Sequence, residues 1–429
     1  MTARERALKA LYDTEKNGTY TNAALSAALG AENITAEDKG FITEIIYGVV
    51  SNKTALDYII SRYSKLKLKK ISPWVLCILR MGIFQMYYMD KIPHSAACNE
   101  AVKLAKKYSH GAGAGFVNGV LRSFSRDADS FEFPKTDNEI YDLSLEYSYP
   151  EWITKSISDE YGIDRCRDLY IENAKAHGAA IRVNTLKTDT KKCAERLKSE
   201  GIETRQAEKI PNCLIVEFGK GLTNTAVYRD GLFSIQNISS QLAVAALDPK
   251  AGETVIDMCS APGGKACAAA ERMENRGRIK AFDIFEHKIR LIENSAKRLG
   301  IDIIDCEVGN SAEPNKDLYW IADRVLADVP CSGLGVIHKK PDIKWHRKES
   351  DIAELAAMQK KILENAALYV KKGGVLVYST CTILNAENGA QTERFLSEHS
   401  EFTKIYEEQI LTGSLGESGF YICKMQKNN

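Results

Sequence analysis

The chain has 429 residues, which predicts two to four domains at about 150 residues each. Hydrophobic residues make up 44% and charged residues 27%, as in ordinary globular proteins, so a disordered or fibrous chain is excluded. The formal net charge of +1 hides an uneven distribution: segment 62–126 holds twelve Lys/Arg and two acidic residues, a local charge of +10. Such a basic segment favours binding to a polyanion, because each neutralised phosphate releases counterions.

Eleven cysteines are spread from Cys77 to Cys423 without a CxxC pair, which predicts neither a disulfide framework nor a thiolate zinc site. The seven histidines show no ligand spacing, so we expect no metal. The first residues carry frequent charges and lack the apolar core of a signal peptide. No stretch approaches the ~20 apolar residues of a membrane span. We therefore expect a soluble cytoplasmic protein with no membrane partner.

The apolar pattern of residues 1 to about 125 predicts a series of helices. Apolar residues from Phe41 to Val50 recur at i, i+4 and i+8, and Thr35 with Asp38 forms a loose capping box ahead of them. No alternating strand pattern occurs here, so this part is expected to be all-α. The polar stretch 124–138 is predicted to be a linker.

The rest of the chain predicts mixed structure. Strands are expected at 180–183 and 213–218 with a helix at 191–199, which gives a small α+β segment of unassigned role. From about Leu232 strands and helices alternate, with strands predicted at 254–258, 278–283, 301–306, 324–328 and 374–379. This alternation is typical of a parallel, doubly wound sheet, which binds ligands at the carboxyl ends of its strands. The predicted domains are 1–135, 136–230 and 231–429.

The loop DMCSAPGGK at 257–265 follows the first strand of this sheet and opens a helix. Its adjacent glycines let the backbone approach a ligand, and the helix start offers unpaired N–H groups. It matches neither the Walker A nor the GxGxxG pattern, and an ordinary turn would explain the glycines alone. Asp283, however, ends the next strand, where an acid receives ribose hydroxyls in nucleotide-binding folds. Together the two features favour an adenosine-containing cofactor.

Two cysteine-containing turns follow later strands, DVPCSG at 328–333 and STCT at 379–382. A single cysteine is more often a small buried hydrophobic residue than a nucleophile. Two thiols and Asp328 at neighbouring strand ends favour nucleophilic addition by sulfur. A redox couple is the alternative interpretation.

These motifs resemble the RNA cytosine-5 methyltransferases. The matching sequences are CSAPGGK at 259–265, LADVPCSG at 326–333, PDIKW at 341–345 and YSTCT at 378–382, with Asp283. The most similar branch modifies bacterial small-subunit ribosomal RNA and is known as RsmB, Sun or Fmu. IPHSAACNEAV at 92–102 and GFVNGVLR at 115–122 resemble the NusB-type RNA-binding domain of this branch. The resemblance is weakest over 136–230. It implies a NusB-like helical domain, a small RNA methyltransferase N-terminal subdomain and a Rossmann-like catalytic domain.

The resemblance also implies a role for each site residue. Cys381 is expected to add to carbon 6 of the target cytosine, so that carbon 5 can take a methyl group from S-adenosylmethionine. Cys331 would assist release of the adduct, and Asp328 would hold the base edge. The expected cofactor-binding residues are Cys259, Ser260, Ala261, Pro262, Gly263, Gly264, Lys265, Asp283, Asn310 and Asp328. Asn310 and Asn237 stand where the family commonly has an acid, and we expect at most an altered cofactor contact.

A basic loop with one tryptophan, 338–347, follows Cys331. A solvated surface would explain it, but its position after the catalytic turn favours an RNA contact. The expected RNA-binding residues are Lys65, Lys67, Lys69, Lys70, Lys339, Lys340 and Arg347.

The target cytosine must leave its stack, which favours an unpaired segment of RNA. We therefore expect a monomeric, S-adenosylmethionine-dependent enzyme acting on 16S ribosomal RNA. A transfer RNA methyltransferase and a non-catalytic RNA-binding or ribosome assembly factor remain alternatives. The non-catalytic one is disfavoured because binding alone requires neither Cys331 nor Cys381.

Overall fold

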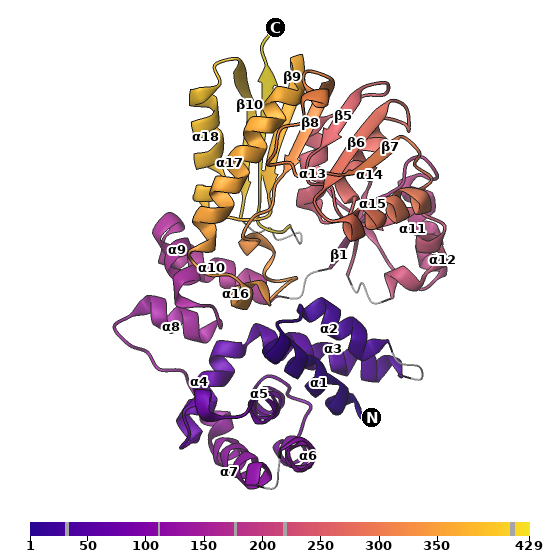
Figure 1. Cartoon of the computed structure of the whole chain (residues 1–429). Coiled ribbons are helices and arrows are strands. Elements are labelled where there is room, and N and C mark those ends of the chain that lie inside the picture. Colours follow the sequence, from indigo (N-terminus) through magenta and orange to yellow (C-terminus); the bar gives the residue numbers. More distant parts are fainter. Residues whose placement is uncertain (31–33, 110–111, 176–177, 218–220, 412–416) are drawn as a thin grey trace. The chain divides into compact units, whose positions relative to one another are not determined.

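The computed structural model describes residues 1–30, 34–109, 112–175, 178–217, 221–411 and 417–429. Its backbone contacts divide the chain into two compact units (Figure 1). The first comprises Met1–Tyr170 and Ile337–Arg347, and the second comprises Ile171–Val336 and Lys348–Asn429. Within the described residues no helix is long and apolar enough to cross a membrane. The predicted domain boundaries after residues 135 and 230 stay predictions.

The first unit is helical, as predicted for residues 1–125. Its helices are α1 Ala3–Asn17, α2 Thr21–Leu29, α3 Ala36–Ser51, α4 Lys53–Tyr63, α5 Pro73–Tyr87, α6 His94–Tyr108, α7 Ala112–Asp127, α8 Glu139–Glu146, α9 Glu151–Tyr161 and the short α16 Ile343–His346, while α10 Ile163–Ala174 crosses the unit boundary. The Thr35 side chain caps α3 by accepting from the Asp38 backbone N–H (3.1 Å), which confirms the predicted cap. The linker predicted from residue 124 begins too early, because Phe124 is fully buried in the helical core and α7 continues to Asp127.

The second unit begins with a small antiparallel sheet in the order β2-β3-β1-β4. Its strands are β1 Ala179–Val183, β2 Arg205–Gln206, β3 Cys213–Val216 and β4 Phe233–Ile235, with helices α11 Thr190–Ser199 and α12 Ala226–Arg229. The predicted strands at 180–183 and 213–218 and the helix at 191–199 are found within a few residues, although residue 218 lies outside the described residues. β2 and β4 were not predicted because two or three residues carry no periodicity.

A seven-stranded sheet in the order β10-β11-β9-β8-β5-β6-β7 forms the main part of this unit. Its strands are β5 Thr254–Asp257, β6 Arg278–Asp283, β7 Ile304–Val308, β8 Ala322–Asp328, β9 Val370–Thr380, β10 Phe402–Ile410 and β11 Phe420–Lys427. β5 to β9 pair in parallel, as predicted. The expectation of a wholly parallel sheet is wrong at one edge, where β11 and β10 run antiparallel. Neither β10 nor β11 was predicted. As an edge strand, β10 exposes most of its polar residues and shows no apolar alternation, and β11 is a short run of mostly buried residues without alternation.

The strand predicted at 301–306 starts later, at Ile304. Helix α15 ends in a left-handed residue, Gly300, and the Ile301 backbone N–H bonds back to Ala296 O (2.9 Å). Ile301 is therefore part of the helix cap, where a buried apolar residue is common.

Helices cover both faces of the large sheet (Figure 1). α13 Ile238–Leu247, α14 Gly264–Arg272 and α15 Glu286–Leu299 share one apolar core with Val255 and Leu326. α17 Asp351–Tyr369 and α18 Gly389–Glu398 share the other core with Ile256 and Val325. Successive residues of a strand point to opposite faces of the sheet, so each strand contributes side chains to both cores. A ligand site can therefore form only at the strand ends and in the loops that follow them.

Candidate active site

The two cysteine-containing turns leave adjacent parallel strands. Asp328, the last residue of β8, is in register with Ser379 on β9. Cys331 lies three residues after Asp328, and Cys381 lies two residues after Ser379. Both turns therefore lie at the carboxyl ends of these two neighbouring strands. Their sulfur atoms are 3.2 Å apart, and the Cys381 backbone N–H points at Cys331 Sγ (3.3 Å). Positive φ at Gly333 (+78°) turns the chain just after Cys331.

Asp328 is held from both sides. Ser379 Oγ donates to its Oδ1 (2.8 Å), and the Lys265 ammonium contacts its Oδ2 (2.5 Å). Burial opposes the charge on Lys265, but the Asp328 carboxylate overcomes this and raises the pKa of Lys265. The carboxylate is thus fixed beside the thiol pair by a cation from the first turn of α14.

The two thiols have different surroundings. The hydrogen bond with Cys381 and burial raise the pKa of the Cys331 thiol well above its usual value. Cys331 is therefore suited to hold a proton. Cys381 is only partly buried and can meet a reactant. The pair can divide a reaction between a nucleophile and a proton-transfer group.

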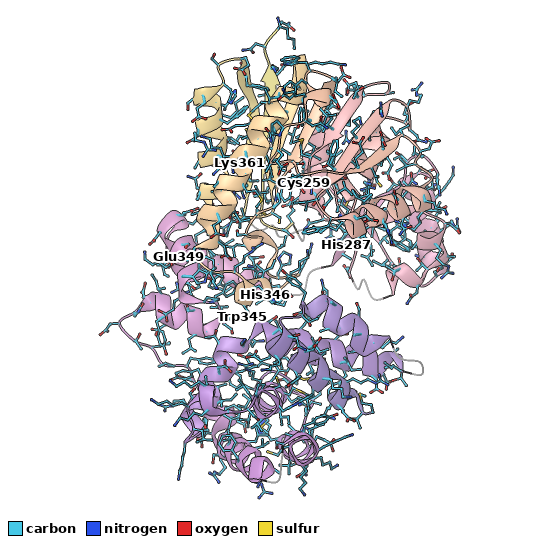
Figure 2. All side chains as sticks on the ribbon, in the orientation of Figure 1. Cys259, His287, Trp345, His346, Glu349 and Lys361 are labelled. Atoms are coloured by element: carbon cyan, nitrogen blue, oxygen red, sulfur yellow. The ribbon has the colours of Figure 1, made fainter. Side chains whose placement is uncertain are left out.

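The loop after β5 approaches other elements closely. At Gly263, φ is +94°, and a Cβ there would lie 3.0 Å from the backbone of Ile292 on α15. The Ser260 backbone N–H donates to Phe282 O at the end of β6 (2.8 Å). Cys259, labelled in Figure 2, follows β5 in this loop, and Asp283 ends the neighbouring strand. The structure thus brings residues 259–265 and Asp283 together at the strand ends.

Buried polar atoms in this loop fit the predicted S-adenosylmethionine. Both carboxylate oxygens of Asp257 and the hydroxyl of Ser260 are buried without a well-oriented hydrogen-bonding partner among the described residues. Burial and the Asp328 carboxylate raise the pKa of Asp257 to about 7. An ammonium group of a ligand would satisfy these acceptors.

A cavity of about 210 Å³ lies next to the loop, lined by Met258, Phe282, Val308, Gly309, Asn310 and Ser311 among others. Its apolar side chains suit a flat ring such as adenine. Asn310 folds back on its own loop, where its Oδ1 accepts from Ala312 N (3.1 Å) and its Nδ2 donates to Glu313 (2.8 Å). Asn237 serves as the N-cap of α13 by accepting from Ser239 N (3.1 Å).

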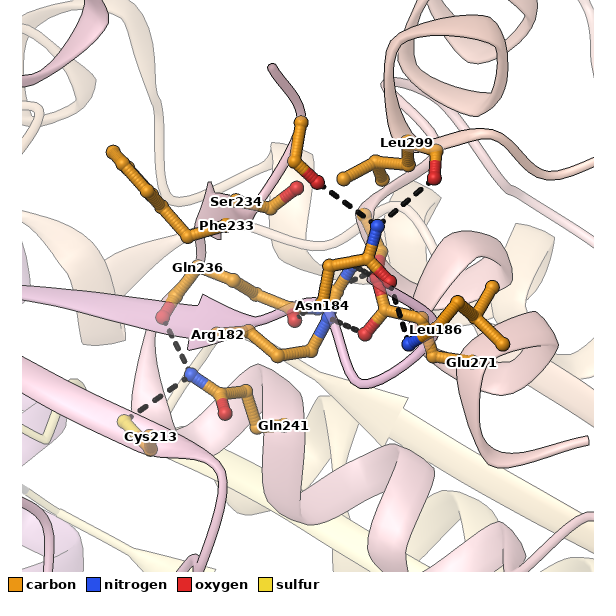
Figure 3. Close-up of polar contacts among 12 residues, drawn as sticks. Arg182, Asn184, Leu186, Cys213, Phe233, Ser234, Gln236, Gln241, Glu271 and Leu299 are labelled. Atoms are coloured by element: carbon orange, nitrogen blue, oxygen red, sulfur yellow. Dashed lines mark hydrogen bonds and ion pairs between the residues drawn. The ribbon is translucent and has the colours of Figure 1, made fainter. Parts of the chain in front are cut away.

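A buried arginine from the small sheet supports the cofactor loop, and the sequence did not reveal it. Arg182 on β1 makes two bonds to the Glu271 carboxylate on α14 (2.8 and 2.9 Å) and also bonds Gln236 (Figure 3). Its guanidinium also donates to the carbonyl of Gly264 in the loop (2.8 Å). In the sequence, Arg182 stands out only as a charged residue within a short apolar strand. This pattern predicts that its side chain is buried, but it does not predict which residues the side chain binds.

The predicted RNA-binding residues all belong to the first unit. Lys65, Lys67, Lys69, Lys70 and Lys340 are exposed, while Lys339 and Arg347 are partly buried. Burial lowers the pKa of Lys339 to about 8.

The basic loop that contains these last residues is less exposed than expected. Lys344 is only 3% exposed and donates to Ser51 O (2.8 Å) and Ser148 O (2.7 Å). The indole N–H of Trp345, labelled in Figure 2, donates to Val50 O (2.7 Å). The side chains of Lys344 and Trp345 are therefore bound to carbonyls within the first unit, and the RNA contact expected of this loop stays a prediction for Lys339, Lys340 and Arg347.

Comparison with known proteins agrees with this geometry. Three family models match: the NusB family over residues 1–126, the RsmF/B-like ferredoxin-like domain over 149–221, and the 16S rRNA methyltransferase RsmB/F over 244–421. The chain is 38% identical over 443 aligned positions to "Probable ribosomal RNA small subunit methyltransferase B" of Bacillus subtilis, covering 99% of this chain and 98% of the relative. The chain belongs to the RsmB/F family of 16S rRNA methyltransferases.

Other RsmB/F relatives and a solved structure extend over the same length. Ribosomal RNA small subunit methyltransferase B of Vibrio cholerae is 30% identical, with 100% of this chain and 98% of the relative covered. The crystal structure of PH0851 is 26% identical with a TM-score of 0.83, and 98% of each chain is covered. Family membership confirms the predicted NusB-like helical domain, the small α+β middle part and the S-adenosylmethionine-dependent methyltransferase domain.

Proposed function

We propose that this RsmB/F chain forms 5-methylcytosine in 16S ribosomal RNA through a covalent bond between Cys381 and the base. The observation that carries the proposal is the thiol pair, with Cys331 Sγ 3.2 Å from Cys381 Sγ beside the Asp328 carboxylate. RNA binding alone would require neither thiol nor their placement beside a cofactor loop.

Each residue has one task in this reaction. Cys381 attacks carbon 6 of cytosine, which makes carbon 5 nucleophilic. Asp328, fixed by Lys265 and Ser379, holds the base edge and supports protonation at the ring nitrogen. S-adenosylmethionine supplies the methyl group, and residues 259–265, Asp283 and Asn310 hold it. Carbon 5 then loses its proton to water, the bond between carbon 6 and Cys381 Sγ breaks as the double bond of the ring re-forms, and Cys331 assists release by giving its proton to the leaving thiolate.

The substrate is an unpaired cytosine of 16S ribosomal RNA, because Cys381 cannot reach carbon 6 of a stacked base. The exposed lysines of the first unit and residues 339, 340 and 347 bind neighbouring RNA phosphates. The enzyme acts in the cytoplasm as a monomer and uses no metal.

Transfer of labelled methyl from S-adenosylmethionine to purified 16S ribosomal RNA and to transfer RNA tests this function. Nucleoside analysis of each RNA then identifies the product. We expect 5-methylcytosine in ribosomal RNA alone. Label in transfer RNA alone would support the proposed methyl transfer reaction but contradict 16S ribosomal RNA as its substrate. Absence of label from both naked and partly assembled ribosomal RNA, with cofactor bound, would favour the binding-factor alternative.

A further inference from the structure

Glu387 is a buried carboxylate that none of the motifs includes. It ends the 3₁₀ helix Asn385–Glu387, six residues after Cys381, and its side chain is 0% exposed. A carboxylate at this depth is costly unless hydrogen bonds satisfy it, so its partners indicate what it is there to hold.

Its partners lie on both sides of Cys331. Glu387 Oε1 accepts from the Ser332 backbone N–H (2.8 Å) and from Gln359 Nε2 (3.0 Å), while Oε2 accepts from Ser332 Oγ (2.5 Å). Gln359, on α17, also donates to Pro330 O (2.9 Å). The residues before and after Cys331 are therefore both tied to this one cluster.

The same cluster reaches the Cys381 turn. Ser332 Oγ and Thr382 Oγ1 are 2.7 Å apart, and the Gly335 backbone N–H donates to Cys381 O (3.0 Å). Tyr378 on β9 donates to the Glu387 carbonyl (2.6 Å) and so fixes the helix that carries the carboxylate. Both cysteine turns lie beyond the ends of their strands, where the sheet ladder no longer sets their spacing.

We propose that Glu387 is a positioning residue that keeps Cys331 in proton-transfer distance of the Cys381 adduct and so sets the rate of adduct release. The inference rests on the proposed function of the two thiols. Glu387 acts through its hydrogen bonds to Ser332 and Gln359. Because proton transfer needs hydrogen-bond reach, a shift of about 1 Å in Cys331 should slow release by up to about 10²-fold.

The test is Glu387→Ala incubated with 16S ribosomal RNA and S-adenosylmethionine, followed by denaturing gel electrophoresis. We expect a protein–RNA complex that resists denaturation and accumulates over time, together with a lower turnover rate. Affinity for S-adenosylmethionine should stay within a few-fold of wild type. Glu387→Gln keeps one oxygen acceptor for the Ser332 N–H and should restore part of the release rate.

Two further variants separate positioning from general destabilisation. Gln359→Leu loses the bonds to Pro330 O and Glu387 without removing the carboxylate, so it should trap a smaller amount of complex even if Glu387→Ala folds poorly. Thr392→Val is the matched control: it removes a buried hydroxyl of the same unit that bonds Tyr421 (2.7 Å) and Gly389 O (3.1 Å), so the bonds between Glu387, Ser332 and Gln359 are kept. It should lower the melting temperature without trapping RNA.

Cys331→Ala separates the role of Glu387 from the proposed function itself. Complex formed by Cys331→Ala but by neither Glu387→Ala nor Gln359→Leu would overturn the role of Glu387 and leave the proposed function intact. Absence of complex with Cys331→Ala as well would contradict the roles of the thiol pair, and with them this inference. If Thr392→Val also trapped RNA, loss of stability would explain the complex formed by Glu387→Ala, and the role of Glu387 would be overturned.

Discussion

Asp328 shows how a single side chain can be held ready by residues far apart in the sequence. Its two oxygens are bound by Ser379, the register partner on β9, and by Lys265 at the start of α14. Neither contact depends on the other, so the carboxylate cannot rotate without losing one of them. Catalytic power in such a site comes from groups that are oriented before the substrate arrives.

Cys381→Ala should abolish methyl transfer to 16S ribosomal RNA, because the variant lacks the sulfur proposed to add to carbon 6 of the base. Binding of S-adenosylmethionine should stay within a few-fold of wild type, since Cys381 is not among the residues proposed to hold it. Methyl incorporation and calorimetric titration measure the two effects. Cys306→Ala, which changes a partly buried thiol on β7, should leave the rate nearly unchanged. Near-normal activity of Cys381→Ala would refute its role as nucleophile.

Cys331→Ala should accumulate a covalent complex with RNA, because the group that assists release is lost while Cys381 can still add to the base. The complex appears as a shifted band on a denaturing gel. The double variant Cys331→Ala/Cys381→Ala should give no band. A band that persists in the double variant would mean that another residue forms the bond.

Because of Asp257, the free energy of unfolding should fall as the pH rises from about 4 to about 7. Its folded-state pKa is raised to about 7 from an ordinary value of 3.8, so the native protein holds a proton in this window that the unfolded chain has lost. Because only the native state holds this proton, the free energy of unfolding falls by up to about 1.4 kcal/mol for each unit by which the pH rises. Denaturant unfolding of wild type and Asp257→Asn without added cofactor, from pH 4 to 7, measures the difference. Equal pH slopes for the two proteins would contradict it.

At the scale of elements, the small sheet acts on the cofactor loop through one strand. Arg182 on β1 joins Glu271 and the Gly264 carbonyl of α14, so the start of this helix is fixed by a different sheet from the one it packs on. We therefore expect the small sheet to contribute to cofactor binding as well as to its own packing.

Arg182→Lys should therefore weaken S-adenosylmethionine binding by about tenfold, because an ammonium cannot bridge a carboxylate, an amide and a carbonyl as the planar guanidinium does. The dissociation constant from calorimetry should rise more than the turnover number at saturating cofactor falls. Arg298→Lys is the matched control, since Arg298 bonds the carbonyls of Tyr228 and Phe233 but not the loop. A lower melting temperature with unchanged cofactor affinity would show that Arg182 is only structural.

At the scale of the molecule, the near-zero net charge conceals a basic segment within the helical unit. The local charge of +10 over residues 62–126 belongs to the part that matches the NusB family, whereas the thiol pair and the cofactor loop lie in the second unit. RNA affinity and methyl transfer are thus expected to depend on different residues.

Replacing Lys65, Lys67, Lys69 and Lys70 by Ala should weaken RNA binding and flatten its salt dependence. The log–log slope should fall by about 0.7 for each phosphate of single-stranded RNA that the variant no longer neutralises. Fluorescence anisotropy over a range of salt concentrations measures both quantities. Replacing four exposed lysines of the second unit, Lys191, Lys192, Lys198 and Lys250, serves as the control. An unchanged slope for the first variant would exclude these residues from RNA binding.

Much of the fold and the motif positions followed from the sequence. The helices of the first unit, the parallel strands and the turns that carry Cys331 and Cys381 were predicted because each is encoded by periodicity or turn chemistry within some ten neighbouring residues. The polar edge strand β10 and the burial of Lys344 were not, since neither has a local signal.

The tertiary structure alone decided the distances on which the chemistry depends. The sequence placed Cys331 and Cys381 at strand ends, but only the tertiary structure brings their sulfur atoms to 3.2 Å, through the register of β8 with β9 and the hydrogen bonds that join the two turns beyond it. Likewise, the partners of Arg182 and Glu387 are far away along the chain or outside any motif. Contacts of this kind arise from packing between elements, which the order of residues within one element does not specify.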